Sequence, residues 1–255
     1  MTSASFNKSP YTNKPLRRKA YGHISHLPCS RLGSGDHHCS PGEAKILLEK
    51  TRDKHDKIIV CEKIDGSNVA ICKKDEQIIP INRAGYPAHT ANNNCHKTFS
   101  QWAYKNQSKF ETLLNEGDWI SGEWIALAHG TIYDLKDRSP FVAFDIFRSG
   151  KRVPYEELLS RCIKSGIQTV PILHAGEKPC SVGTAFSLLG VKGHYGAQEP
   201  AEGCVWRCER KGQFQFIAKY VRHNKIDGKY LPHVSGEKEK WLWPSSLQKP
   251  ACNKL

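Results

Sequence analysis

The stretch CEKIDGSN at residues 61–68 decides how the chain around it folds. An apolar, β-branched run at residues 58–61 leads into it, and a second such run at residues 69–72 follows. Runs of this kind are typical of strands, and the Asp-Gly pair between them is a turn signal. The pattern predicts a hairpin of strand, tight turn and strand, with Lys63 at the mouth of the turn.

Lys63 is the candidate nucleophile of this stretch. An amine attacks phosphorus only when it is deprotonated, and partial burial or a nearby metal cation would lower the lysine pKa toward that state. A K-x-D-G pattern also describes a surface lysine beside a turn, because four-residue patterns recur by accident. The chemistry therefore depends on partners that the rest of the chain supplies.

The composition describes a basic globular protein. Of the 255 residues, 38 are Lys or Arg and 25 are Asp or Glu, which gives a formal net charge of +13. Such a charge favours a polyanionic partner, and nucleic acid comes first. No apolar run is long enough to span a membrane, and residues 1–6 lack an apolar signal core. We therefore expect a monomeric, cytoplasmic protein without a membrane partner.

Ten cysteines occur in a chain of this length without a secretion signal, which favours reduced thiols over disulfides. Cys29, His37, His38 and Cys39 lie close together in the sequence. No C-x-x-C pair occurs, so a structural zinc site has little support. The sequence leaves the roles of these four residues open.

Strand and helix patterns alternate irregularly along the chain, which predicts an α+β fold with mixed or antiparallel sheets flanked by helices. Further strands are expected at residues 77–81, 119–125, 141–147, 202–207 and 214–221. Helices are expected at residues 41–54, 96–116, 154–164 and 182–189, the first with Ser40 as N-cap and Glu43 three residues later. We expect a basic mobile tail at 1–20, one domain at 21–230 and a short basic tail at 231–255.

Charged residues stand in or beside several of the apolar strands. Glu123, Asp145 and Glu202 are carboxylates near strand ends, and Lys219 lies inside a strand. Taken singly, each is more simply a surface or capping residue. Together with Lys63 they form a set that can hold a divalent metal and a polyphosphate in one cleft.

The order of these motifs resembles the covalent nucleotidyltransferase superfamily of ATP-dependent ligases and mRNA capping enzymes. EKIDGSN at residues 62–68 looks like its first motif, K-x-D-G, with the Asn typical of RNA ligases. The later motifs follow in the right order as NRAG at 82–85, SGEW at 121–124, FVAFDIF at 141–147, EGCV at 202–205 and AKYV at 218–221. The resemblance spans residues 58–222 and is greatest to RNA ligases of the double-strand-sealing phage type.

This resemblance implies a nucleotidyltransferase (ligase adenylation) domain that uses ATP and acts on RNA ends or a nicked duplex. Lys63 would attack the α-phosphorus of ATP, form a lysyl-AMP and release pyrophosphate. The AMP would then pass to a 5′-phosphate. A 3′-hydroxyl would displace it and seal the strand.

The resemblance also assigns residues to the nucleotide. Glu123 would hold the ribose hydroxyls, and Phe144 would stack on the adenine. The backbone around Glu62 would contact the base. Arg83 and Asn68 would orient the phosphates and the 5′-end of the nucleic acid.

The last two motifs imply the metal and α-phosphate contacts. Glu202 would help to bind Mg²⁺, for which Mn²⁺ can substitute, and Lys219 would bind the α-phosphate. The family pattern has two lysines one residue apart in the last motif, whereas this chain has only Lys219 there. Arg222 and Lys225 are candidates for the second lysine, although neither has its spacing.

Chain length separates the members of the superfamily. DNA ligases and capping enzymes carry an OB-fold after the last motif, and the 33 residues that follow Arg222 are too few to build one. This favours an RNA ligase. A minimal ATP-dependent DNA ligase and a non-catalytic RNA-binding protein are the alternatives, and the sequence does not specify RNA, DNA or hybrid substrates or a template strand.

Overall fold

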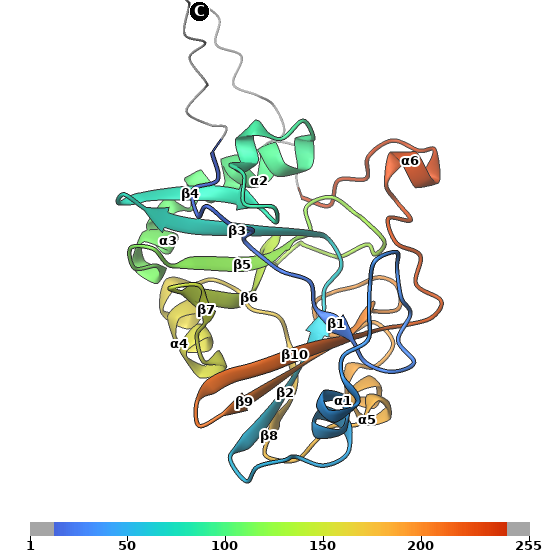
Figure 1. Cartoon of the computed structure of the whole chain (residues 1–255). Coiled ribbons are helices and arrows are strands. Elements are labelled where there is room, and N and C mark those ends of the chain that lie inside the picture. The colour runs from blue at the N-terminus through green and yellow to red at the C-terminus, as the bar shows by residue number, and fades with distance from the viewer. Residues whose placement is uncertain (1–12, 244–255) are drawn as a thin grey trace, which may run out of the picture.

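Two five-stranded sheets, one above the other in Figure 1, form the body of the protein. The computed structural model describes residues 13–243. The strands of the first sheet lie in the order β1 (Ser25–His26), β10 (Gln213–Val221), β9 (Gly203–Arg210), β2 (Asp56–Lys63) and β8 (Ile172–Gly176). The strands of the second lie in the order β4 (Gln77–Asn82), β3 (Ser67–Lys74), β5 (Trp119–Trp124), β6 (Phe141–Arg148) and β7 (Lys151–Arg152). All pairings between these strands are antiparallel except the parallel pair β1–β10, which confirms the predicted α+β fold with mixed and antiparallel sheets.

The predicted hairpin of β2 and β3 is wrong, because the two strands belong to different sheets. Residues 64–66 carry the chain from one sheet to the other. The amides of Asp65 and Gly66 donate to Tyr133 Oη at 2.9 Å and to Glu123 Oε1 at 3.1 Å rather than to a neighbouring strand. A turn signal shows where the chain bends but not which groups satisfy its amides, and here distant side chains do so.

Helix α1 (Pro41–Leu48) begins as predicted. Ser40 Oγ accepts the Glu43 amide at 3.2 Å, and the Glu43 carboxylate accepts the Ser40 amide at 3.0 Å, which completes a capping box. The helix ends several residues earlier than expected. The Asp56 carboxylate accepts the amides of residues 52–53 and holds a turn there instead.

The predicted helix at 96–116 is two helices, α2 (Asn94–Lys105) and α3 (Gln107–Leu113). Asn106 lies between them with φ −108° and ψ 19°, and its side chain donates to the Trp102 carbonyl at 2.9 Å. An Asn side chain that bonds to nearby backbone competes with helical hydrogen bonds, and the helix is interrupted at this point.

The remaining helices are short and lie around the sheets in Figure 1. They are a 3₁₀ turn (Ala88–Thr90), α4 (Tyr155–Ser165), α5 (Val182–Leu189) and α6 (Pro232–Ser235). Gly166 ends α4 with φ 63°, as its position in the sequence predicts.

Aromatic side chains of α2 and α3 form part of the largest core. Phe99, Trp102 and Phe110 are buried against Trp124 and Phe141 of the second sheet. A second core packs α1 and α5 against the first sheet. Helices thus cover one face of each sheet. The faces that the two sheets turn toward each other are left to form a site between them.

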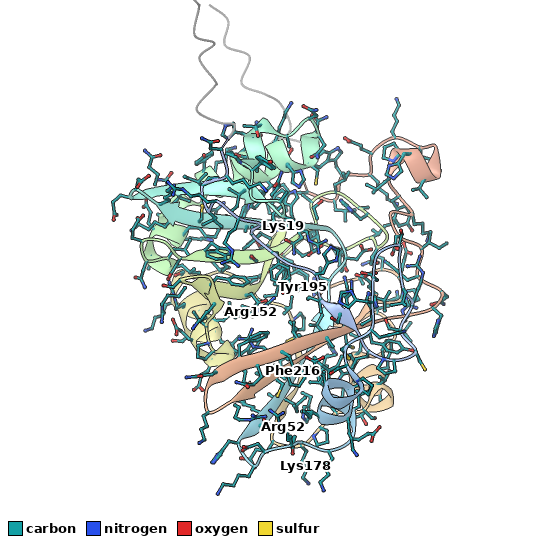
Figure 2. The ribbon with its side chains drawn as sticks, viewed as in Figure 1. Lys19, Arg52, Arg152, Lys178, Tyr195 and Phe216 are labelled. Atoms are coloured by element: carbon teal, nitrogen blue, oxygen red, sulfur yellow. The ribbon has the colours of Figure 1, made fainter. Side chains whose placement is uncertain are left out.

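A cation–π contact between Arg152 and Phe214 joins the two sheets. The guanidinium carbon of Arg152, on β7, lies 4.6 Å from the centre of the Phe214 ring on β10. Figure 2 shows Arg152 in the space between the sheets. This contact, with those of Asp145 described below, fixes how the sheets face each other.

Segments near both ends of the described residues pack on this body. Ala20 is buried, and Trp119 Nε1 donates to its carbonyl oxygen at 2.9 Å. Residues 241–243 pack against the largest core. Both segments fall within stretches that the sequence assigns to tails, of which residues 1–12 and 244–255 lie outside the described residues.

Within residues 13–243, no helix is long and apolar enough to cross a membrane. The nine cysteines of this part of the chain carry free thiols. No group of three or more His, Cys, Asp or Glu side chains in it is arranged to hold a metal ion. His37 and His38 instead contact Ser25 Oγ and the Leu27 carbonyl oxygen, each at 3.1 Å, and so hold β1 in place.

Candidate active site

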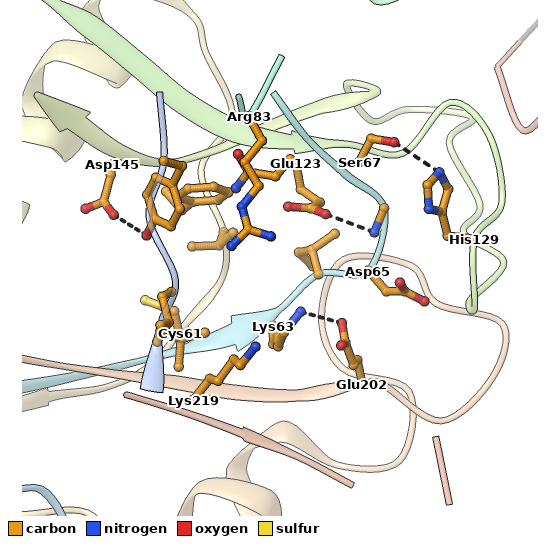
Figure 3. Close-up of a pocket in the computed structure, with 18 of the residues that line it drawn as sticks. Cys61, Lys63, Asp65, Ser67, Arg83, Glu123, His129, Asp145, Glu202 and Lys219 are labelled. Carbon is orange, nitrogen blue, oxygen red and sulfur yellow. Dashed lines mark hydrogen bonds and ion pairs between the residues drawn. The ribbon is translucent and has the colours of Figure 1, made fainter. Parts of the chain in front are cut away.

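A cavity of about 640 Å³ lies between the two sheets, around the stretch that links β2 to β3 (Figure 3). Strands of both sheets and the loops beside them supply its walls. The eight residues that the sequence singles out all line it, namely Glu62, Lys63, Asn68, Arg83, Glu123, Phe144, Glu202 and Lys219.

Lys63, the last residue of β2, contacts Glu202 inside this cavity (Figure 3). Its Nζ lies 2.7 Å from Glu202 Oε2, and the two side chains are only 22% and 8% exposed. Burial by itself would lower the Lys63 pKa, but the negative charges of Glu202 and Glu123 outweigh burial and raise it. Burial therefore does not deprotonate Lys63, and the ligand-free site holds an ammonium.

Glu123 faces Lys63 from β5. Its Oε1 accepts the Gly66 amide at 3.1 Å, and burial raises its pKa to about 8, with Glu202 adding to the rise and Lys63 opposing it. A Cβ at position 66 would lie 2.5 Å from the Trp124 carbonyl oxygen, so the linker can pass this close to β5 only with glycine. The close passage fixes Lys63 and Glu123 in one site.

Glu62 and Asn68 border the cavity on either side of Lys63. Neighbouring side chains in a strand point to opposite faces, and the Glu62 carboxylate turns away to accept the His194 amide at 2.7 Å. Burial raises the pKa of Glu62. Asn68 Oδ1 is buried without a hydrogen-bond partner among the described residues, which leaves it available to a ligand.

An aromatic wall closes one side of the cavity. Phe144 meets the ring of Tyr21 edge to face, with 5.0 Å between the ring centres. Sequence reasoning missed Tyr21, which directly follows the stretch assigned to a tail and lies in no motif. Arg83 enters from the turn after β4, and its guanidinium donates to the Gly22 carbonyl oxygen at 3.1 Å.

Lys219 projects into the cavity from β10. Burial, with the charge of Lys63 nearby, lowers its pKa. Ile217, two residues earlier in the same strand, also lines the cavity. Because residues two apart in a strand share a face, an apolar side chain stands next to the single lysine of the last motif.

Neither residue considered as a second lysine takes that place. The Arg222 guanidinium donates to the carbonyl oxygens of Pro200 and Ala201. Lys225 is buried, and its Nζ contacts Asp65 Oδ2 at 2.5 Å. Among the described residues that line the cavity, neither occurs.

Asp145, one of the carboxylates in the set that could hold a metal, joins the two sheets. It is buried and accepts three hydrogen bonds, from Tyr21 Oη at 2.6 Å, Arg152 at 2.8 Å and Arg207 at 2.5 Å. Asp145 lies on β6 and Arg207 on β9, so the contact joins the two sheets at the floor of the cavity. Both of its oxygens accept hydrogen bonds from the protein.

The arrangement suits nucleophilic attack on a polyphosphate. It places an amine, Lys63, against a carboxylate that can accept a proton, with Lys219 and Arg83 on the same cavity. Cations placed in this way stabilise the charge that develops on phosphate oxygens.

Comparison with known proteins identifies the family of the chain. A sequence model of the RNA ligase family matches residues 56–221, which confirms the resemblance of the motifs at the level of the family; the phage type stays a prediction. A search of curated protein sequences returns no match.

Solved RNA ligases share the fold. A structure of a Naegleria gruberi RNA ligase variant with ATP and Mn matches with a TM-score of 0.51 at 18% identity, over 78% of this chain and 60% of that chain. A structure of Naegleria gruberi RNA ligase with PPi matches with a TM-score of 0.53 at 18% identity, over 92% of this chain and 65% of that chain. The chain thus spans less than two thirds of the length of these relatives.

Proposed function

The chain belongs to the RNA ligase family, and we propose that it is an ATP-dependent ligase that joins the 5′-phosphate of one RNA end to the 3′-hydroxyl of another. The observation that carries this proposal is the contact of Lys63 with Glu202, at 2.7 Å, inside a cavity to which all six motifs contribute residues. RNA ends or a nicked duplex are the proposed substrates, and the net charge of +13 supports a nucleic-acid partner.

The first step attaches AMP to the protein. Lys63 Nζ attacks the α-phosphorus of ATP, a nitrogen–phosphorus bond forms, the bond to the bridging oxygen breaks and pyrophosphate leaves. The lysine must lose its proton for this attack. Glu202 Oε2, 2.7 Å away, is placed to accept it and release it to solvent before the attack, and burial raises the Glu202 pKa, which makes that carboxylate a better base.

The other cavity residues bind and orient the nucleotide. Phe144 and Tyr21 offer an aromatic wall to the base, and Glu123 offers a carboxylate to the ribose hydroxyls. Lys219 and Arg83 carry the positive charge that offsets the α-phosphate and the leaving pyrophosphate. The AMP then passes to an RNA 5′-phosphate, from which the 3′-hydroxyl displaces it.

The residues present fit Mg²⁺ or Mn²⁺ as a metal shared with the phosphates. Mg²⁺ is commonly held by one or two carboxylates together with substrate phosphates and water, so a cage of three protein ligands is not required. Glu202 would hold it, with the unpartnered Asn68 Oδ1 nearby in the cavity. The ion would neutralise charge on the phosphate oxygens.

The proposal is tested by incubating the protein with ATP labelled on the α-phosphate and a divalent metal, then denaturing it. The protein is treated with pyrophosphate beforehand, because this reverses AMP attachment and removes any AMP that the protein acquired in the cell. Acid-labile, base-stable label on the protein supports a lysyl-AMP. Label from GTP alone indicates capping chemistry, label passed only to DNA ends indicates a DNA ligase, and absence of label favours an RNA-binding protein.

The rate of AMP attachment at subsaturating ATP is expected to rise with pH from 6 to 9. The pH dependence of the rate at subsaturating ATP reports the ionisation of groups in the protein without bound ATP. In the protein without ATP the pKa of Lys63 is raised, so the ammonium form dominates from pH 6 to 9. Each rise of one pH unit therefore yields about ten times more of the free amine. Glu202→Gln removes the nearest negative charge and lowers the Lys63 pKa, so its profile should level off at a lower pH. A wild-type plateau below pH 7 would contradict the charge state assigned to Lys63.

A further inference from the structure

A segment outside the family match reaches the candidate active site. Residues 25–39 precede the matched residues, 56–221, and contain β1 and the loop that follows it. Asp36 in this loop lies beside Lys219, with 3.6 Å between Asp36 Oδ1 and Lys219 Nζ. No other carboxylate in the described residues forms an ion pair with Lys219.

Backbone hydrogen bonds fix the position of Asp36 beside Lys219. β1 pairs with β10 so that His26 stands opposite Lys219, and the Leu27 amide donates to the Lys219 carbonyl oxygen at 2.8 Å. On its other side, the His26 amide donates to the His37 carbonyl oxygen at 2.8 Å. β1 therefore lies between β10 and the end of the loop, which sets Asp36 at the level of Lys219.

Side chains fix the Asp36 carboxylate as well. Its Oδ2 accepts the Gly33 amide at 3.0 Å and lies 3.0 Å from His26 Nε2. His26 is 1% exposed, and its Nδ1 is 2.7 Å from Ser30 Oγ. Ser30 Oγ also accepts the Val221 amide at 2.9 Å, which ties this chain of contacts back to β10. One oxygen of Asp36 is thus held by the fold, and the other faces Lys219.

We propose that Asp36 is a positioning residue that holds the Lys219 ammonium toward the α-phosphate of ATP. This inference rests on the proposed function. A lysine has a flexible four-carbon stem, so its charge is placed only as well as its partners place it. Where the family pattern has two lysines, this cavity has Lys219 beside Ile217. No second lysine of the last motif is therefore present to keep the charge in place, and Asp36 holds Lys219 instead.

The charges around Lys219 agree with this role. Lys63 on β2 repels it, Glu202 before β9 attracts it, and Asp36 is its only direct ionic contact among the described residues. Glu202 is engaged by Lys63 at 2.7 Å. Without Asp36, repulsion by Lys63 would leave Lys219 free to swing away from the reacting phosphate.

The test measures AMP attachment in a single turnover at saturating ATP. Asp36→Asn keeps the shape of the side chain and an oxygen for the Gly33 amide, but removes the charge. Its rate constant should fall about 10-fold to 100-fold, the loss typical of a misplaced reacting group. Asp36→Glu should recover part of that loss. Glu76→Gln, which removes an ion pair with Lys73 between two residues that do not line the cavity, is the matched control and should keep the wild-type rate.

A double-mutant cycle separates positioning from a structural role. In a Lys219→Met background, Asp36→Asn should change the remaining rate less than about twofold, because the two residues act as one unit. Thermal unfolding of each variant shows whether it folds. A wild-type rate for Asp36→Asn, or an equal loss in the Lys219→Met background, would overturn the proposal. If the wild-type protein attaches no AMP, the proposed function itself fails and this inference falls with it.

Discussion

Lys63→Arg is expected to lose covalent AMP attachment by about 10 000-fold or more, the scale seen when a nucleophile is removed from an enzyme that forms a covalent intermediate. Arginine keeps the positive charge next to Glu202, but its guanidinium does not deprotonate in proteins and cannot act as the amine does. The measurement is label retained on denatured protein after incubation with ATP labelled on the α-phosphate. Retention of label at even a tenth of the wild-type rate would place the nucleophile elsewhere.

Arginine is a better probe here than alanine. Lys63 is not a loosely packed surface residue, because its ammonium pairs with the largely buried Glu202. Lys63→Ala would leave that carboxylate unpaired, and a loss of activity could then reflect a disturbed fold. Lys63→Arg should unfold near the wild-type temperature and bind RNA as the wild type does. Binding is measured by the mobility of labelled RNA.

The sequence predicts seven of the ten described strands because each of the seven is marked locally, and it misses β1, β7 and β8. The runs around Lys63, Glu123 and Lys219 carry β-branched and aromatic residues between turn residues, and each forms a strand near the expected bounds. Its motif residues also come together in one cavity. What local patterns could not show is which strands pair. The Asp-Gly signal predicts a hairpin turn, whereas Tyr133 and Glu123, distant in sequence, hold that linker.

The site residues that escaped prediction are those that act through distant partners. Tyr21 lines the cavity through its contacts with Phe144 and Asp145, more than 100 residues away in sequence. Asp36 becomes significant only because β1 pairs in parallel with the last strand. No spacing in the sequence encodes either contact, since both depend on how the two sheets and the N-terminal segment pack.

Asp145→Asn is expected to lower the free energy of unfolding by about 3 kcal/mol, as when one partner of a buried ion pair is removed. The buried carboxylate contacts Arg152 and Arg207, and both guanidiniums also lie over the Phe214 ring, at 4.6 and 5.1 Å from its centre. Two cations held this close need the negative charge between them. An amide supplies none, and it also presents a donor where both oxygens now accept. Urea unfolding followed by tryptophan fluorescence gives the value.

Glu76→Gln is the control for this experiment too. Its carboxylate pairs with Lys73 at 3.1 Å, but the side chain is 79% exposed. Pairs of that kind typically contribute about 0–1 kcal/mol, so the unfolding midpoint should barely move. Because Asp145 joins β6 to β9 at the floor of the cavity, its loss should loosen the sheets where the nucleotide binds and weaken ATP binding as well. An Asp145→Asn protein as stable as the Glu76→Gln protein would mean that apolar packing alone sets the angle between the sheets.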